Sequence, residues 1–129
     1  HVRSEAVQLK DALSAAVEDD ARAFEAVIQA QKLPKDSSER EAALQNALKG
    51  AAEVPMRVAE LSARVLELAR QVRDEGLKSA RSDVTVAAHL AEAAIKGALL
   101  NVRENLDSIT DEQFVAEYRE RSAKVEALI

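Results

Sequence analysis

Hydrophobic residues recur every three or four positions along most of this chain, which is the spacing of amphipathic α-helices. The pattern predicts an all-α protein with four to five helices. The expected helices cover residues 3–32, 38–53, 54–75 and 83–106, and a last one follows residue 110. Long helices joined by short connections favour an up-and-down bundle in which consecutive helices are antiparallel.

Prolines and candidate capping residues mark the expected helix boundaries. Pro34 ends the first helix, because the residue before a proline disfavours the α conformation. Pro55 marks a boundary or a kink, since it has no N–H to donate. The candidate caps are Ser38 with Glu41, Thr110 with Gln113, Ser82 or Asp83 after the loop 77–83, and Gly76 as a left-handed residue at a helix end.

The third expected helix carries the most regular apolar seam. Its members alternate four and three positions apart: Val54, Val58, Leu61, Val65, Leu68 and Val72. Such a seam packs closely on a nearly antiparallel helix. It fits a helix of the same chain and a second subunit of a two-fold dimer equally well.

The fourth expected helix is apolar around most of its circumference, so we expect it to be central and the most buried. His89 belongs to a narrow polar stripe on it and is interpreted as solvated, because no partners for a metal site are evident. Asn101 and Asn105 lie one turn apart near its end. Buried amides need hydrogen-bond partners, and spacing alone favours an interhelical or capping network over a binding role.

A carboxylate interrupts the apolar stripe of the first helix. Asp20 stacks nearly in line with Leu13 and Val27, seven positions away on either side. A carboxylate moved from water into an apolar seam is costly unless it takes up a proton or finds a partner. Asp20 is therefore either bonded to a backbone group or an arginine, or a general acid. Position alone favours the structural interpretation.

Composition narrows the class of protein. With 3 glycines and 2 prolines in 129 residues, the chain has too few turns for a sheet protein. The net charge of −5, with acids and bases interleaved, argues against nucleic acid and anionic membranes as partners. The absence of cysteine excludes disulfides and thiolate metal sites and is compatible with a reducing cytoplasm. No run of 18 apolar residues and no signal peptide is visible.

Several motifs, in the right order, resemble one protein family. The segment SDVTVAAHLAEAAIKGALLNVRENL at 82–106 is similar to the signature of the cyclodeaminase domain of formiminotransferase-cyclodeaminase. This family also contains stand-alone methenyltetrahydrofolate cyclohydrolases. VEDDARAFEAVIQAQKLPK at 17–35 resembles an earlier family motif, an acidic pair followed by Ala-Phe and closed by Leu-Pro-Lys. Val54-Pro55 and the spacing of 109–114 also match, so the resemblance extends from about residue 6 to 115.

The resemblance implies an all-α fold that associates as homodimers and binds a folate. The cyclodeaminases of this family convert formimidoyltetrahydrofolate to methenyltetrahydrofolate with loss of ammonia. Its cyclohydrolases open the methenyl form with water. The second acid of the family's acidic pair is the proposed proton donor, and it corresponds to Asp20. No cofactor beyond the tetrahydrofolate substrate, and no metal, is expected.

Further site residues follow from residue type and motif membership. The resemblance makes Lys35 a candidate for holding the glutamate carboxylates of the folate. The candidates for shaping the rest of the folate site are Arg81, Ser82, Asp83, Asn101 and Asn105. The alternative to an enzyme is a non-catalytic helical dimer or scaffold that retains the fold.

One family feature is missing from this sequence. Members begin with a glycine-rich segment of the type Pro-Gly-Gly-Gly-Ser followed by an Ala-rich helix, and nothing similar stands here. We therefore expect residues 1–129 to form a single cyclodeaminase-like helical domain without that segment. The first residues are His-Val-Arg rather than Met, which favours an origin in a longer protein.

Overall fold

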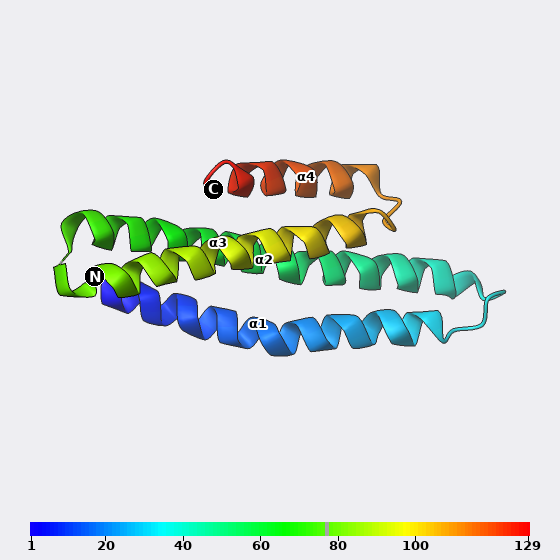
Figure 1. The fold of residues 1–129 in the computed structure, drawn as a ribbon. Coiled ribbons are helices and arrows are strands. Elements are labelled where there is room, and N and C mark those ends of the chain that lie inside the picture. Colours follow the sequence, from blue (N-terminus) through cyan, green and yellow to red (C-terminus); the bar gives the residue numbers. More distant parts are fainter. Residues whose placement is uncertain (77) are drawn as a thin grey trace.

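The computed structural model describes residues 1–76 and 78–129, and these residues form helices joined by short connections (Figure 1). The helices are α1 (Val2–Gln31), α2 (Ser38–Glu75), the 3-10 turn η1 (Lys78–Ala80), α3 (Arg81–Leu106) and α4 (Glu112–Glu126). Each α-helix runs back along the one before it, so the predicted all-α, up-and-down bundle is confirmed.

The centre of the bundle is α2, not α3. Helix α2 packs against α1 and α3, and the short α4 rests on α2 and α3. The prediction that α3 is the most buried helix is wrong for this chain. Its large apolar residues Val86, Leu90 and Leu100 remain exposed, with Leu90 at 67%. The apolar circumference of α3 is wider than the other described helices cover.

The core lies chiefly between α2 and α3. A row on α2, four and three positions apart, faces the buried side of α3: Ala52, Met56, Ala59, Ala63 and Leu66. On α3, Ile95, Leu99 and Val102 are almost fully buried against this row. The alanines keep the two helices close, and the larger side chains fill the space between them.

Helix α4 buries Tyr118 and Val125 in this core, and polar contacts add to its attachment. The Tyr118 hydroxyl donates to Glu53, and the guanidinium of Arg121 bonds both Glu53 and Glu60 of α2, at 2.8 Å from Arg121 Nε to Glu60 Oε1. The Phe114 ring stacks on Tyr118. The last helix thus closes one end of the α2–α3 pair.

Helix α1 buries few of its residues against α2. Its buried residues are Leu9, Ala16 and Ala30, whereas the large apolar residue Phe24 is 64% exposed. Glu5 forms a two-pronged ion pair with Arg64 of α2, which lowers the pKa of the Glu5 carboxyl through hydrogen bonding. Much of the apolar surface of α1 therefore faces open space.

Pro55 lies inside one continuous helix. The sequence predicted a boundary or a kink there. The boundary is wrong, because α2 runs unbroken from Ser38 to Glu75 with Pro55 buried. The second and third expected helices are therefore one. The predicted seam from Val54 to Val72 is only partly covered: Val54 and Leu68 are buried, and the other four members are half-buried.

Several predicted helix ends are shifted or differently built. The N-caps are Ser37 and Asp111, one residue from the expected Ser38 and Thr110, and each accepts a backbone N–H, from Glu39 and Phe114 respectively. In each case two adjacent polar residues competed for the cap.

The connection into α3 also differs from the prediction. Leu77, the first residue of the expected loop, lies outside the described residues. Arg81, Ser82 and Asp83 belong to the first turn of α3, whose N-cap position is Ala80, so neither Ser82 nor Asp83 is the cap. Gly76 has φ −90° and ψ 173°, not the left-handed conformation, but the Val72 carbonyl occupies the space that a Cβ would need.

Candidate functional site

An open cleft brings together α1, α2 and α3 around Asp20. It has a volume of about 370 Å³. Its apolar wall on α2 is the turn that contains Val54, Pro55 and Val58, and its wall on α3 contains Ala94, Ala98 and Asn101. The cleft therefore combines a carboxylate, an amide and a small apolar lining, which is the usual make-up of a small-molecule site.

The two acids of the pair at 19 and 20 have different surroundings. Asp19 turns toward α2, where its carboxylate lies 2.5 Å from Nη2 of Arg57. Asp20 is exposed at the cleft, and within residues 1–76 and 78–129 its side chain makes no ion pair or hydrogen bond to protein. The expectation that Asp20 is buried in an apolar seam is therefore wrong, because the stripe of α1 faces the cleft there. The arginine partner proposed as its structural role belongs to Asp19.

The two asparagines of α3 also separate in role. Asn101 is exposed and lines the cleft with Asp20. Asn105 is half-buried, and its side-chain amide donates to two carbonyl oxygens, that of Asn101 at 2.9 Å and that of Ala51 on α2 at 3.2 Å. The interhelical network that spacing favoured thus forms at Asn105.

The remaining candidate residues lie away from the cleft. Lys35 is exposed in the connection between α1 and α2, about 17 Å of helix beyond Asp20 at a rise of 1.5 Å per residue. Arg81, Ser82 and Asp83 are exposed at the opposite end of the bundle, and Asp83 lies about 27 Å of helix before Asn101. Of the candidate site residues, only Asp20 and Asn101 line the cleft that the described residues form.

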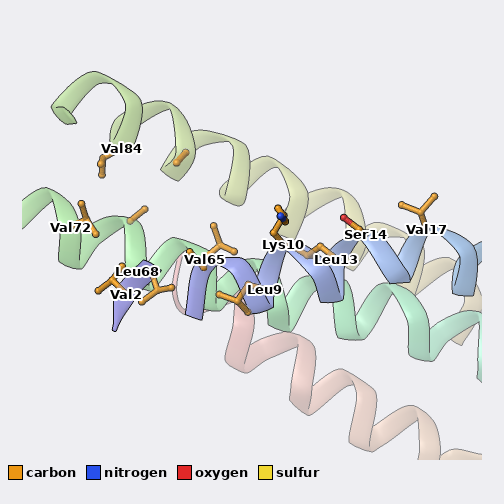
Figure 2. A pocket seen from close by; sticks show the side chains of 13 residues that line it. Val2, Leu9, Lys10, Leu13, Ser14, Val17, Val65, Leu68, Val72 and Val84 are labelled. Atoms are coloured by element: carbon orange, nitrogen blue, oxygen red, sulfur yellow. The ribbon is translucent and has the colours of Figure 1, made fainter. Parts of the chain in front are cut away.

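A second, larger groove continues from the cleft toward the N-terminus of α1 (Figure 2). Its volume is about 610 Å³, and it shares Leu13 and Val17 with the cleft. Valine, leucine and alanine side chains of α1, α2 and α3 form almost all of its lining, and Lys10 and Ser14 are its polar members. The surface next to Asp20 is therefore apolar on one side.

Comparison with known proteins identifies the family. The sequence model of the family described as formiminotransferase-cyclodeaminase matches residues 1–124, nearly the whole chain. The chain belongs to the formiminotransferase-cyclodeaminase family. The resemblance inferred from the motifs is thereby confirmed.

Named relatives in this family come from animals and bacteria. The chain is 42% identical over 113 residues to formimidoyltransferase-cyclodeaminase of Sus scrofa, covering 84% of this chain and 21% of that protein. It is 35% identical over 125 residues to methenyltetrahydrofolate cyclohydrolase of Methylorubrum extorquens, covering 94% of this chain and 59% of that one.

A solved structure agrees in fold. The crystal structure of formiminotetrahydrofolate cyclodeaminase from Thermotoga maritima superposes with a TM-score of 0.80 at 33% identity, covering 88% of this chain and 55% of that chain. The chain thus spans between a fifth and three fifths of the length of these members of the formiminotransferase-cyclodeaminase family.

Two features of this family member were not recognised from sequence. Arg57 pairs with Asp19, and Pro55 forms the cleft wall. The first was hidden because an ion pair between distant helices leaves no periodic signal. The second could have been recognised from the position of a proline inside an apolar helical pattern.

None of the described helices has a stretch apolar and long enough to cross a bilayer. Over the same residues, no three His, Asp or Glu side chains gather as a metal site would need.

Proposed function

We propose that this chain forms part of a folate-converting enzyme, a formimidoyltetrahydrofolate cyclodeaminase or a methenyltetrahydrofolate cyclohydrolase, with its reaction centre at the Asp20 cleft. One observation carries the proposal: Asp20 of α1 and Asn101 of α3, both from motifs shared with the family, line the same cleft. Family membership and the names of the relatives support it.

Asp20 would act as the acid–base group at the one-carbon unit. In cyclisation, a second folate nitrogen bonds to the formimidoyl carbon, and the imino nitrogen of the formimidoyl group departs. A proton from the Asp20 carboxyl lets it leave as ammonia rather than as amide anion. In hydrolysis of the methenyl form, the Asp20 carboxylate takes the proton of the attacking water. Both reactions use the same carboxyl group and require no cofactor beyond the tetrahydrofolate.

Asn101 would hold a polar edge of the folate, because its amide offers both a donor and an acceptor to the cleft. Lys35 would attract the glutamate carboxylates, which extend away from the reacting end of a folate. Arg81, Ser82 and Asp83 lie farther from the cleft along the bundle, so in our proposal they shape the site only through a second copy of the chain.

The proposed assembly is a cytoplasmic homodimer. A row of exposed small and apolar residues on α3, at intervals of four and three, supports it: Val86, Leu90, Ala93, Gly97 and Leu100. Such a row is the pattern of a helix that packs on another helix. An exposed contiguous apolar face marks an interaction surface in many proteins.

The decisive experiment measures turnover by the full-length protein. Methenyltetrahydrofolate hydrolysis is followed by its near-ultraviolet absorbance, and the formimidoyl substrate by release of ammonia. We expect one of the two to be consumed. If the intact, folded protein turns over neither, the alternative of a non-catalytic helical dimer or scaffold is correct.

A further inference from the structure

Pro55 removes a hydrogen bond from the middle of α2. In an α-helix each N–H donates to the carbonyl four residues earlier. Pro55 has no N–H, so the carbonyl of Ala51 loses its usual donor, and the proline ring pushes that carbonyl away from the helix axis. A buried or half-buried carbonyl without a donor is destabilising.

The side chain of Asn105 supplies the missing donor. Its Nδ2 lies 3.2 Å from the Ala51 oxygen and 2.9 Å from the Asn101 oxygen. A primary amide has two N–H groups, one for each of these carbonyls. The only carbonyl of α2 that a proline deprives of its donor is thus the one that Asn105 reaches from α3.

One of these carbonyls lies one turn from the α2 wall of the cleft, and the other belongs to a residue of the α3 wall. Ala51 lies one turn before Pro55, which lines the cleft on α2. Asn101 lines it on α3 and faces the same space as Asp20. Asn105 itself does not line the cleft, yet its single amide group connects the proline turn of one wall to the asparagine turn of the other.

We propose that Asn105 is a positioning residue that replaces the N–H absent at Pro55 and thereby fixes the proline turn of α2 against Asn101 across the candidate site. This assignment differs from the place in the folate site that the family resemblance implied for Asn105, and it agrees with the interhelical network that its spacing favoured. A group that contacts substrate matters whatever stands at position 55. A group that serves the Ala51 carbonyl matters only while residue 55 lacks an N–H.

The test is a double-mutant cycle in the full-length protein between Asn105→Ala and Pro55→Ala. With Pro55 present, Asn105→Ala leaves the Ala51 carbonyl unpaired, and the unfolding equilibrium constant in urea should rise about tenfold, or about 1.4 kcal/mol. In the Pro55→Ala background the backbone N–H is restored. Asn105→Ala should then raise the unfolding equilibrium constant no more than about twofold, which would show that the two positions are coupled. The matched control is Asn46→Ala, an exposed asparagine of α2, which should behave alike in both backgrounds.

The kcat/KM of the same variants distinguishes a positioning residue from one that only stabilises the fold. With Pro55 present, Asn105→Ala should lower kcat/KM about tenfold at a temperature where the protein is folded, because small displacements of site groups are costly. In the Pro55→Ala background the further loss should be about twofold or less. Equal losses in the two backgrounds would assign Asn105 to direct substrate contact and overturn the proposal.

The stability cycle does not depend on the proposed function, whereas the activity cycle rests on it. If the protein turns over no folate but the two substitutions are coupled in unfolding, Asn105 still replaces the N–H absent at Pro55, and only the proposed enzyme function is contradicted. Uncoupled unfolding contradicts this replacement whatever the activity. If Asn105→Ala alone does not fold, recovery of folding by Pro55→Ala supports the proposal, and failure of the double variant to fold contradicts it.

Discussion

At the scale of single residues, neighbouring carboxylates do different things because a helix turns about 100° between them. Asp19 is half-buried against Arg57, and Asp20 opens into the cleft with Asn101. Periodicity singled out Asp20 for the wrong reason, since the stripe it interrupts is not covered at that point. The family motif predicted that Asp20 is a proton donor, and Asp20 lines a cleft that could admit a small molecule.

Asp20→Asn tests that role. Asparagine has nearly the same size but cannot donate a carboxyl proton, so we expect kcat to fall by about 10²–10⁴-fold, the usual value of general acid–base catalysis. The helical circular dichroism and the melting temperature should remain close to those of the parent, because Asp20 has no protein partner among the described residues. Retained turnover would return Asp20 to a surface position without chemistry.

The matched control is Asp19→Asn, which should show the opposite pattern. This change removes the interhelical pair with Arg57. Because both side chains are about two fifths exposed, the free energy of unfolding should fall by up to about 1 kcal/mol. Turnover of the folded protein should change little. Urea unfolding and steady-state kinetics on the two variants separate the structural acid from the chemical one.

At the scale of elements, the start of α4 combines a cap with an ion pair. The Asp111 carboxylate accepts from the Phe114 N–H at 3.1 Å and lies 2.8 Å from the Lys49 ammonium of α2. The hydrogen bond from Lys49, and then that from Phe114, hold the pKa of Asp111 below its ordinary value. The stabilisation by this group is therefore complete above the ordinary aspartate pKa and is lost as the pH falls through the lowered folded value.

Asp111→Asn should therefore flatten the acid limb of the stability profile. Asparagine caps a helix about as well as aspartate, but it neither titrates nor pairs with Lys49. We expect the melting temperatures of parent and variant to differ most at neutral pH. The difference should begin to shrink below the ordinary aspartate pKa of about 4 and should vanish only below the lowered pKa of the folded state. Melting curves from about pH 2.5 to 7 measure this, and a constant difference over that range would contradict it.

At the scale of the whole molecule, local patterns predicted the elements well and their mutual positions less well. The 3.6-residue period located α1 and α3, because apolar residues recur in both at helical spacing, and the short connections between helices predicted the up-and-down order. It divided α2 at Pro55, since no local signal says that Asn105, distant in sequence, supplies the missing donor. It also ranked α3 as most buried, because a broad apolar circumference does not say whether the same chain or another covers it.

The exposed side of α3 leads to the last prediction. Leu90 is the second of the five residues in the row from Val86 to Leu100 and is 67% exposed. If two copies pair along this row, Leu90→Glu places a carboxylate in an apolar contact, where burial without a partner is costly. We expect the full-length parent to be a dimer by light scattering after gel filtration and the variant to dissociate. His89→Glu, on the adjacent exposed polar stripe, is the matched control and should remain dimeric. A dimer that survives Leu90→Glu would place the interface on another face, and the partly covered seam of α2 from Val54 to Val72 would be the next surface to change.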